Sequence, residues 1–182
     1  KSENKDSLQG AFEDLKNFVD RPMRNLLLIE DDEVQQMSIR ELIGNGDVKT
    51  TVVGTGKDAL DALHSGKFDC MVLDLGLPDM SGVELLEKIK NEPRSRTIPI
   101  IIYTARDLLQ EEEIRLRRLA ENIVLKDVRS PERLLDETAM LLHRNASKLP
   151  DRQRKMLETL HRACPKERKS CWSTTTSATS SR

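Results

Sequence analysis

The sequence of 182 residues is poor in aromatic side chains, in long apolar runs and in net charge. Aromatic residues make up only 3% of the chain, which is too few for the stacking platforms that bind single-stranded nucleic acid. Lys and Arg number 30 against 31 Asp and Glu, so the net charge of -1 provides no bulk attraction to nucleic acid or to an acidic membrane surface. The longest apolar runs, such as residues 26–29 and 100–103, are far shorter than the roughly 20 residues of a membrane-spanning helix. We therefore expect neither nucleic acid nor a membrane as a direct partner.

Cysteine is also scarce, with three residues and no spacing typical of a zinc site or a disulfide framework. Cys70 lies in an apolar run and is predicted to be a buried thiol, whereas Cys164 and Cys171 lie near the C-terminal end. Residues 1–6 are polar and do not resemble a signal peptide. Unpaired thiols without such a signal are typical of a reducing compartment, and we expect a cytoplasmic location.

Short apolar segments alternate with segments of helical periodicity over about 120 residues of the chain. Strands are predicted near residues 25–30, 48–53, 69–74, 98–103 and 122–126. Helices are predicted near residues 33–43, 57–65, 82–91, 107–120 and 131–144. Strict alternation of strand and helix predicts an α/β fold with a doubly wound, five-stranded parallel sheet and helices on both of its faces.

The segments that flank this unit differ from it in composition. We predict an N-terminal linker helix within residues 1–23, followed by the sheet-containing domain at residues 24–146. A C-terminal linker helix is predicted within residues 147–164. Residues 165–182 are rich in Lys, Arg, Ser and Thr, and this composition predicts a disordered tail.

The tail can also be translated in a shifted reading frame into a segment with a regular pattern. When each codon begins at the third base of the preceding one, the genetic code permits Gly-Lys-Lys-Val-Leu-Leu-Val-Asp-Asp-Asp, which has the pattern of a strand followed by an acidic turn. Our hypothesis is that residues 165–182 are a frame-shifted remnant or artefact, and that the parent protein continued into a second domain of the same kind. The nucleotide sequence tests this, because codons incompatible with the second frame would exclude it.

Charged and polar residues stand at the ends of four predicted strands: Glu30 and Asp31 after the first, Asp74 after the third, Thr104 after the fourth and Lys126 at the end of the fifth. The carboxyl ends of parallel strands meet at one edge of the sheet, where open α/β sheets bind their ligands. Clustered carboxylates repel one another, and a hard divalent cation such as Mg²⁺ relieves the repulsion. The Asp74 carboxylate can then attack a phosphoryl group whose charge the metal, Thr104 and Lys126 stabilise.

In order and spacing these residues resemble the receiver (response-regulator) domain of two-component signalling, over residues of about 24–145. Residues 74–82, Asp-Leu-Gly-Leu-Pro-Asp-Met-Ser-Gly, are similar to the signature loop of that family. The resemblance implies a flavodoxin-like (βα)5 fold. It also implies that Asp74 is the phosphoacceptor, Thr104 the switch hydroxyl and Lys126 the lysine of the active site.

The same resemblance implies Mg²⁺ as the cofactor and a phosphohistidine as the phosphoryl donor. Asp31, Asp74 and the Gly76 carbonyl would bind the metal directly, and Glu30 would act through a water molecule. The donor would belong to a histidine kinase or a histidine phosphotransfer domain, and the parent would be a hybrid sensor histidine kinase. No phosphoacceptor-histidine helix, ATP lid or helix-turn-helix is recognisable in the sequence, so we expect no kinase activity from this chain.

Two positions depart from the family pattern. Asp127 follows Lys126 where the family usually has a proline after a cis bond, and a non-proline cis bond costs about 2.5–4 kcal/mol. The bond is therefore either trans or strained, and the Asp127 carboxylate can compete for Lys126. Ile123 stands where the fifth strand commonly carries an aromatic switch residue. Our hypothesis is that this receiver signals weakly through the helix near 107–120, or serves as a phosphate relay or sink.

Two other functions share part of this pattern. A phosphatase of the aspartyl-phosphate type also uses a strand-end Asp and Mg²⁺, but it usually has a second Asp two residues later, where this chain has Gly76. The other is a pseudo-receiver that acts only as a protein-protein interaction module. Asp127 and Ile123 keep that alternative open, whereas the intact Asp74 and Lys126 count against it.

Two further features have structural interpretations. Asp32 can be part of the acidic turn or can serve as the N-cap of the helix near 33–43. The helix near 107–120 is dense in both charges, which we interpret as a solvated face with i,i+4 pairs rather than a docking surface. These charged residues are Glu111, Glu112, Glu113, Arg115, Arg117 and Arg118.

Overall fold

The computed structural model describes residues 23–44, 47–127, 130–144 and 149–163, and their main feature is one sheet of five parallel strands. The strands are β1 (Arg24–Ile29), β2 (Val48–Val53), β3 (Cys70–Leu73), β4 (Ile100–Thr104) and β5 (Asn122–Leu125). Their order in the sheet is β2-β1-β3-β4-β5, which is the order of flavodoxin-like doubly wound folds. The predicted fold class is therefore confirmed.

The helices are α2 (Glu33–Ile43), α3 (Gly56–Ser65), α4 (Gly82–Asn91), α5 (Gln110–Leu119), α6 (Ser130–Leu141) and α7 (Asp151–Ala163). The predicted end of α6, near residue 144, is wrong by about one turn. His143 has a φ of 51°, in the left-handed region that terminates helices, and Arg144 donates its backbone N–H back to the Ala139 carbonyl. Most of the predicted N-terminal linker and all of the predicted tail lie outside the described residues.

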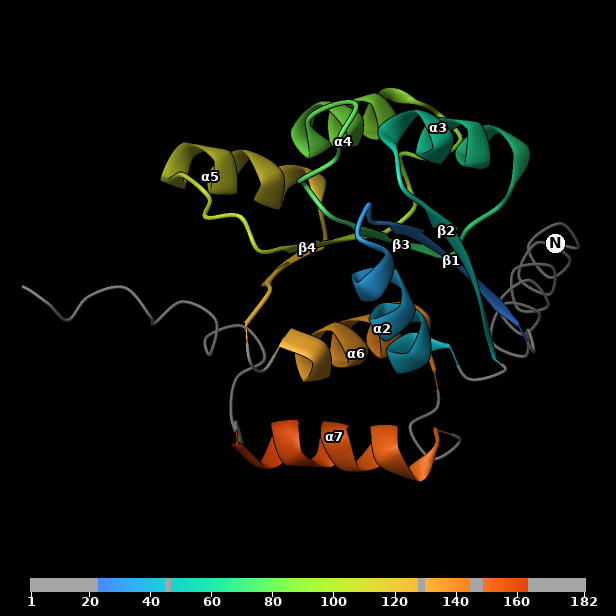
Figure 1. Cartoon of the computed structure of the whole chain (residues 1–182), viewed down its shortest axis with the longest axis vertical. Coiled ribbons are helices and arrows are strands. Elements are labelled where there is room, and N and C mark those ends of the chain that lie inside the picture. The colour runs from blue at the N-terminus through green and yellow to red at the C-terminus, as the bar shows by residue number, and fades with distance from the viewer. Residues whose placement is uncertain (1–22, 45–46, 128–129, 145–148, 164–182) are drawn as a thin grey trace, which may run out of the picture.

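Alternate side chains of the strands enter two separate cores, one on each face of the sheet. Leu27, Ile29, Met71 and Leu73 pack against α3, α4 and α5. Leu26, Leu28, Cys70 and Val72 pack against α2 and α6. Figure 1 shows α3, α4 and α5 covering one face of the sheet and α2 and α6 covering the other.

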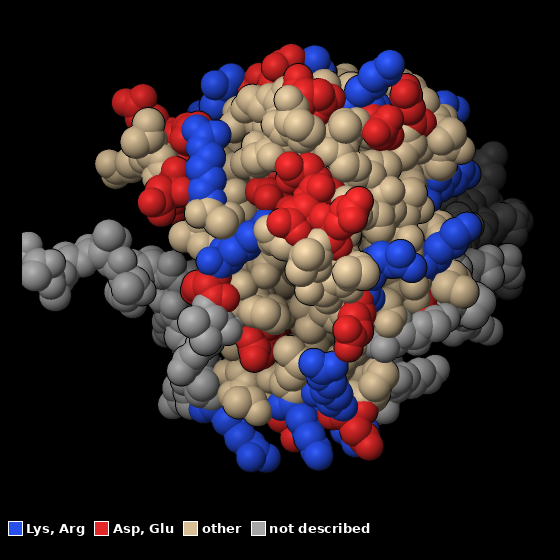
Figure 2. Space-filling view, viewed as in Figure 1, with Lys and Arg blue, Asp and Glu red and all other residues tan. Residues whose placement is uncertain are grey.

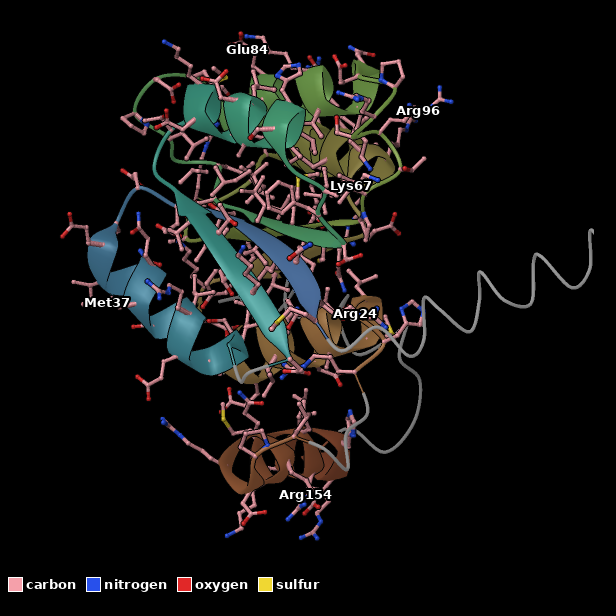
Figure 3. The ribbon with its side chains drawn as sticks, turned by 90° about the vertical axis from the view of Figure 1, so that its right-hand side faces the viewer. Arg24, Met37, Lys67, Glu84, Arg96 and Arg154 are labelled. Carbon is pink, nitrogen blue, oxygen red and sulfur yellow. The ribbon has the colours of Figure 1, made fainter. Side chains whose placement is uncertain are left out.

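Helix α7 forms an additional layer outside α2 and α6, as Figure 1 and the rotated view of Figure 3 both show. Leu149 and Leu157 make a small apolar cluster with Leu135 of α6, flanked by Leu42 of α2 and Met156. None of the helices in the described part of the chain is long and apolar enough to span a bilayer.

The thiol of Cys70 is fully buried, as its apolar surroundings in the sequence predicted. Burial raises its pKa to about 12, so the side chain is protonated and behaves as a small apolar group of the core. Cys164 and Cys171 lie outside the described residues.

Candidate functional site

Three carboxylates meet where β1 and β3 end. Oxygen atoms of Glu30, Asp31 and Asp74 all lie within 4.8 Å of one another. The pairing of β1 with β3 brings them together. The Asp74 backbone N–H donates to the Ile29 carbonyl over 2.9 Å, so Asp74 lies beside the end of β1, where Glu30 and Asp31 follow. Figure 2 shows a compact group of acidic side chains near the middle of the face in view.

The three carboxylates differ strongly in exposure. Glu30 is 1% exposed and Asp74 9% exposed, whereas Asp31 is open to solvent. The next acidic residue, Asp32, has a structural role: its carboxylate accepts from the backbone N–H groups of Val34 and Gln35 and caps α2. The N-cap interpretation of Asp32 is thus confirmed, and α2 starts directly beside the carboxylate cluster.

Lys126 directly follows β5, the edge strand of the sheet, and links two of the carboxylates. Its Nζ donates to Glu30 Oε2 over 2.8 Å and to Asp74 Oδ2 over 2.7 Å, and its side chain is only 11% exposed. The same ammonium lies 5.3 Å from the centroid of the Tyr103 ring, at cation–π distance. A largely buried cation therefore holds two carboxylates and rests on an aromatic ring.

These contacts decide the charge states of the site. Burial raises the pKa of Asp74, but the hydrogen bond and charge of Lys126, followed by the Thr104 hydroxyl and the Gly76 N–H, lower it more, so the net pKa lies below its usual value. For Glu30, burial outweighs Lys126 and the pKa is raised. Burial lowers the pKa of Lys126, but its hydrogen bonds to the two carboxylates prevail and raise it. Asp74 is therefore an anion and Lys126 a cation at neutral pH.

Thr104 and Gly76 complete the surroundings of Asp74. Thr104 ends β4, is 1% exposed, and its hydroxyl accepts the backbone N–H of Arg106 over 3.2 Å. The exposed Gly76 donates its N–H to Asp74 Oδ1 over 3.3 Å. The structure thus brings together all the residues that the sequence singled out at this edge.

The donor set fits a hard divalent cation. Its ligands would be carboxylate oxygens, which Mg²⁺ prefers. Glu30 Oε1 is buried and has no hydrogen-bond partner among the described residues, so the site contains an oxygen whose lone pairs are unused. The exposed Asp31 and Gly76 leave the cluster accessible from solvent.

Two residues that position the site have no local signal in the sequence. Asp79 accepts hydrogen bonds from the backbone N–H groups of Gly56 and Lys57, and so ties the loop after β3 to the start of α3. Tyr103 lies under Lys126 and bonds the Ser130 hydroxyl over 2.9 Å. Both contacts join residues more than 20 positions apart, which no periodicity or cap pattern reveals.

The two departures from the family pattern have definite structures. The described residues contain no cis peptide bond, so the Lys126–Asp127 bond is trans. Asp127 lies 3.8 Å from Arg133, whereas Lys126 bonds Glu30 and Asp74. Ile123 is 8% exposed and packs in the core that faces α3, α4 and α5.

The fold and the site together define a receiver-type α/β domain. The family model of the response regulator receiver domain matches residues 26–139, which is more than half of the chain. This chain belongs to the response regulator receiver domain family of two-component signalling.

Two relatives show the range of proteins that contain a similar segment. The chain is 35% identical over 96 residues to the aerobic respiration control sensor protein ArcB of Escherichia coli (strain K12), in a match covering 50% of this chain and 12% of ArcB. It is 30% identical over 105 residues to the two-component response regulator ORR5 of Oryza sativa subsp. japonica, covering 57% of this chain and 78% of ORR5. The chain therefore spans a small part of ArcB but most of ORR5.

Solved structures agree on the fold. The phosphorylated cyanobacterial phytochrome response regulator RcpA superposes with a TM-score of 0.60 at 19% identity, covering 67% of this chain and 95% of RcpA. The receiver domain of the sensor histidine kinase PA1611 from Pseudomonas aeruginosa PAO1, solved with magnesium in its active-site cleft, gives a TM-score of 0.59 at 24% identity. That match covers 66% of this chain and 98% of the PA1611 domain.

Proposed function

We propose that this chain is a phosphoacceptor receiver, which takes a phosphoryl group from a phosphohistidine onto Asp74. The observation that carries the proposal is the contact of Lys126 Nζ with both Asp74 and Glu30 inside a carboxylate cluster. An ionised carboxylate at the end of a strand, with a buried cation beside it, is equipped to attack an electrophilic phosphorus.

The transfer step is a displacement at phosphorus. An Asp74 carboxylate oxygen forms the new O–P bond while the P–N bond to the donor imidazole breaks, and the imidazole nitrogen keeps the bonding pair and takes up a proton. Lys126 then pairs with the phosphoryl oxygens, and the Thr104 hydroxyl donates to one of them. In a separate second step the group is lost to water, which attacks phosphorus as the bond to Asp74 breaks and releases the Asp74 carboxylate and inorganic phosphate.

Asp31, Asp74 and the Gly76 carbonyl would hold Mg²⁺ directly, with Glu30 acting through water. The metal would neutralise the cluster and stabilise negative charge on the transferring group. The chemistry of the carboxylate oxygens and the unpartnered Glu30 Oε1 support this assignment.

The donor we propose is a histidine kinase or a histidine phosphotransfer domain, the partners from which this family receives phosphoryl groups. Similarity to part of the sensor protein ArcB supports a hybrid histidine kinase as the parent. Within this chain we propose a receiver at residues 24–146 with linker segments on both sides, and the shifted frame of the tail suggests a second receiver in the parent. We place it in the cytoplasm, where such donors act. The chain itself would act as a phosphoacceptor without kinase activity.

The two rival functions have less support. A pseudo-receiver needs no reactive site, whereas here Lys126 and Thr104 both contact the Asp74 carboxylate. A phosphatase of the aspartyl-phosphate type needs a general acid two residues after the nucleophile, and Gly76 has no side chain for that role.

Intact-mass analysis after incubation with acetyl phosphate and Mg²⁺ tests the proposal. The phosphoryl adduct of about 80 Da should require Mg²⁺ and should be absent from Asp74→Asn, which removes the nucleophile. Asp61→Asn changes an exposed carboxylate on α3 in the same way and should be modified like the unaltered chain. A folded chain that gains no adduct would leave the pseudo-receiver as the better description.

A further inference from the structure

Tyr103 connects the Lys126 site with the opposite side of the domain. It is the only tyrosine in the sequence and is 8% exposed. The Lys126 ammonium lies 5.3 Å from its ring centroid, and its hydroxyl bonds Ser130, the first residue of α6, over 2.9 Å. One rigid side chain is therefore held at one end by the cation of the phosphoacceptor site and at the other by a helix.

The same ring lines a cavity of about 420 Å³, partly open to solvent, that α7 helps to form. The other walls include Ile39 and Leu42 of α2, Pro131 of α6, and Gln153 and Met156 of α7. Protein cores are close-packed, so a ring beside such a volume has room to turn that a core side chain normally lacks. The space beside the ring is bounded by α2, α6 and α7.

Helix α7 packs on α6 and α2 at the outside of the domain, apart from the two large cores that flank the sheet. Its apolar anchor is the small cluster of Leu149, Leu157 and Leu135. Its polar contacts to the rest of the domain include His161–Asp136 and Arg152–Glu41. Both partners of the Arg152–Glu41 pair are largely exposed, and an ion pair of that kind is screened by water. The Gln153 side chain adds a hydrogen bond to the Leu42 carbonyl. A change at Tyr103 shifts the docking of α7 only if the new position of the ring interacts differently with the docked and undocked states.

We propose that the docking of α7 depends on the phosphorylation state of Asp74, through Lys126 and Tyr103. The inference rests on the proposed function of Asp74. When a phosphoryl group forms there, Lys126 moves from the carboxylate to the phosphoryl oxygens and leaves the face of the Tyr103 ring. The ring, now held only at its hydroxyl end, turns into the cavity and displaces Met156 and Gln153, so that α7 undocks.

The position of Ile123 shows why the signal takes this route. Ile123 packs in the core that faces α3, α4 and α5, on the other side of the sheet from α7. Tyr103 and Val124, paired in the β4–β5 register, belong to the core on the α2 and α6 side. The aromatic ring that can respond to the site thus lies on β4 rather than on β5, and the helix that receives its movement is α7.

Amide hydrogen exchange of the full chain, with and without beryllofluoride and Mg²⁺, tests the coupling. We expect the amides of 151–163 to exchange about fivefold faster or more when the phosphoryl analogue is bound, as for a typical allosteric coupling. Tyr103→Leu removes the ring and should abolish this difference, whereas Tyr103→Phe keeps the ring and should retain it. Arg154→Ala, on the outward side of α7 in Figure 3, is the matched control and should respond like the unaltered chain.

Linkage provides a reciprocal test. Leu157→Asp should undock α7 by placing a charge in its apolar cluster. The affinity of this variant for beryllofluoride should then rise, by the same factor by which bound beryllofluoride lowers the equilibrium constant for docking of α7 in the unaltered chain. The Tyr103 variants keep the inference testable if Leu157→Asp fails to fold.

The outcomes separate this inference from the function on which it rests. If acetyl phosphate modifies Asp74 but α7 exchanges at the same rate with and without the analogue, the coupling is wrong and the phosphoacceptor function stands. A full response in Tyr103→Leu also overturns the coupling, because the signal then bypasses the ring. If Asp74 accepts neither reagent, both proposals fail.

Discussion

The carboxylate of Asp79 caps Gly56, the first residue of α3, from a loop 23 positions further along the chain. It accepts the backbone N–H of Gly56 over 2.8 Å and that of Lys57 over 2.9 Å. The loop that begins with Asp74 is therefore fastened at its far end to a helix terminus, where the orphan N–H groups and the helix dipole favour an anion.

This cap predicts a pH-dependent contribution of Asp79 to stability. The N–H of Gly56, followed by that of Lys57, holds the pKa of Asp79 below its usual value. A carboxyl group with a depressed pKa in the folded state stabilises the fold above its unfolded pKa of about 4, and the contribution is lost as the pH falls through the folded pKa. Asp79→Ala should therefore unfold at a lower temperature than the unaltered chain at pH 7, with a smaller difference at pH 3.

Thermal unfolding followed by circular dichroism measures this effect. Asp79→Asn keeps one acceptor oxygen without the charge. Its unfolding temperature at pH 7 should lie between those of Asp79→Ala and the unaltered chain. An equal difference at both pH values would mean that the charge of Asp79 has no part in the cap.

Replacing Lys126 should affect both chemistry and stability. Lys126→Met leaves the Glu30 and Asp74 carboxylates without their cation, and we expect the free energy of unfolding to fall by about 1–3 kcal/mol at pH 7. Without the cation that stabilises the transferring phosphoryl group, the modification of Asp74 by acetyl phosphate should slow about 100-fold or more. Urea denaturation and time-resolved intact mass measure the two effects.

Lys67→Met, at an exposed lysine, is the matched control and should change neither quantity. A normal rate of modification in Lys126→Met would show that Lys126 only neutralises the carboxylates of the resting site.

Gly76 in the loop after β3 and Gly82 at the start of α4 should differ in their tolerance of a side chain. A Cβ at Gly82 would lie 2.5 Å from the Leu75 Cα, so the backbone must move. A Cβ at Gly76 would meet only Asp74 Oδ1, at 4.0 Å. Gly82→Ala should therefore lower the free energy of unfolding by about 1–3 kcal/mol, the usual cost of overpacking.

Gly76→Ala, the companion variant, should stay within about 0.5 kcal/mol of the unaltered chain. Urea denaturation compares the two directly. Equal effects of both substitutions would show that the loop can shift freely and that the contact of Gly82 with Leu75 imposes no constraint.

Mg²⁺ should stabilise the folded chain through Asp31. Binding at ten times the dissociation constant adds about 1.4 kcal/mol, and removal of the metal with EDTA should reverse the gain. Asp31→Asn should weaken Mg²⁺ binding about tenfold or more, because a charged oxygen ligand is lost while its exposed position spares the fold. Isothermal titration calorimetry measures the affinity.

Asp107→Asn removes an exposed carboxylate after β4 and serves as the control. If it weakens binding as much as Asp31→Asn does, the effect comes from net charge rather than from a ligand.

The sequence predicted most of what depends on local chemistry. Alternating periodicity gave the five strands and the helices between them, because apolar spacing along a segment decides which face it can bury. The cap at Asp32 was predictable because its two N–H partners lie within three residues of it. Glu30, Asp31, Asp74, Thr104 and Lys126 were predictable as one group, because parallel strands bring their carboxyl ends to the same edge of the sheet.

Only the tertiary structure decided which of these groups touch and what else touches them. The ion pairs of Lys126 with Glu30 and Asp74 join β5 to β1 and β3, and burial sets the opposite pKa shifts of the two carboxyl groups. The cation–π contact with Tyr103, and the cavity that α7 helps to form beside it, depend on the packing of elements from distant parts of the chain. Such contacts have no period and no fixed spacing in the sequence, because they arise from the free energy of the whole packed domain rather than from the conformational preference of any one segment.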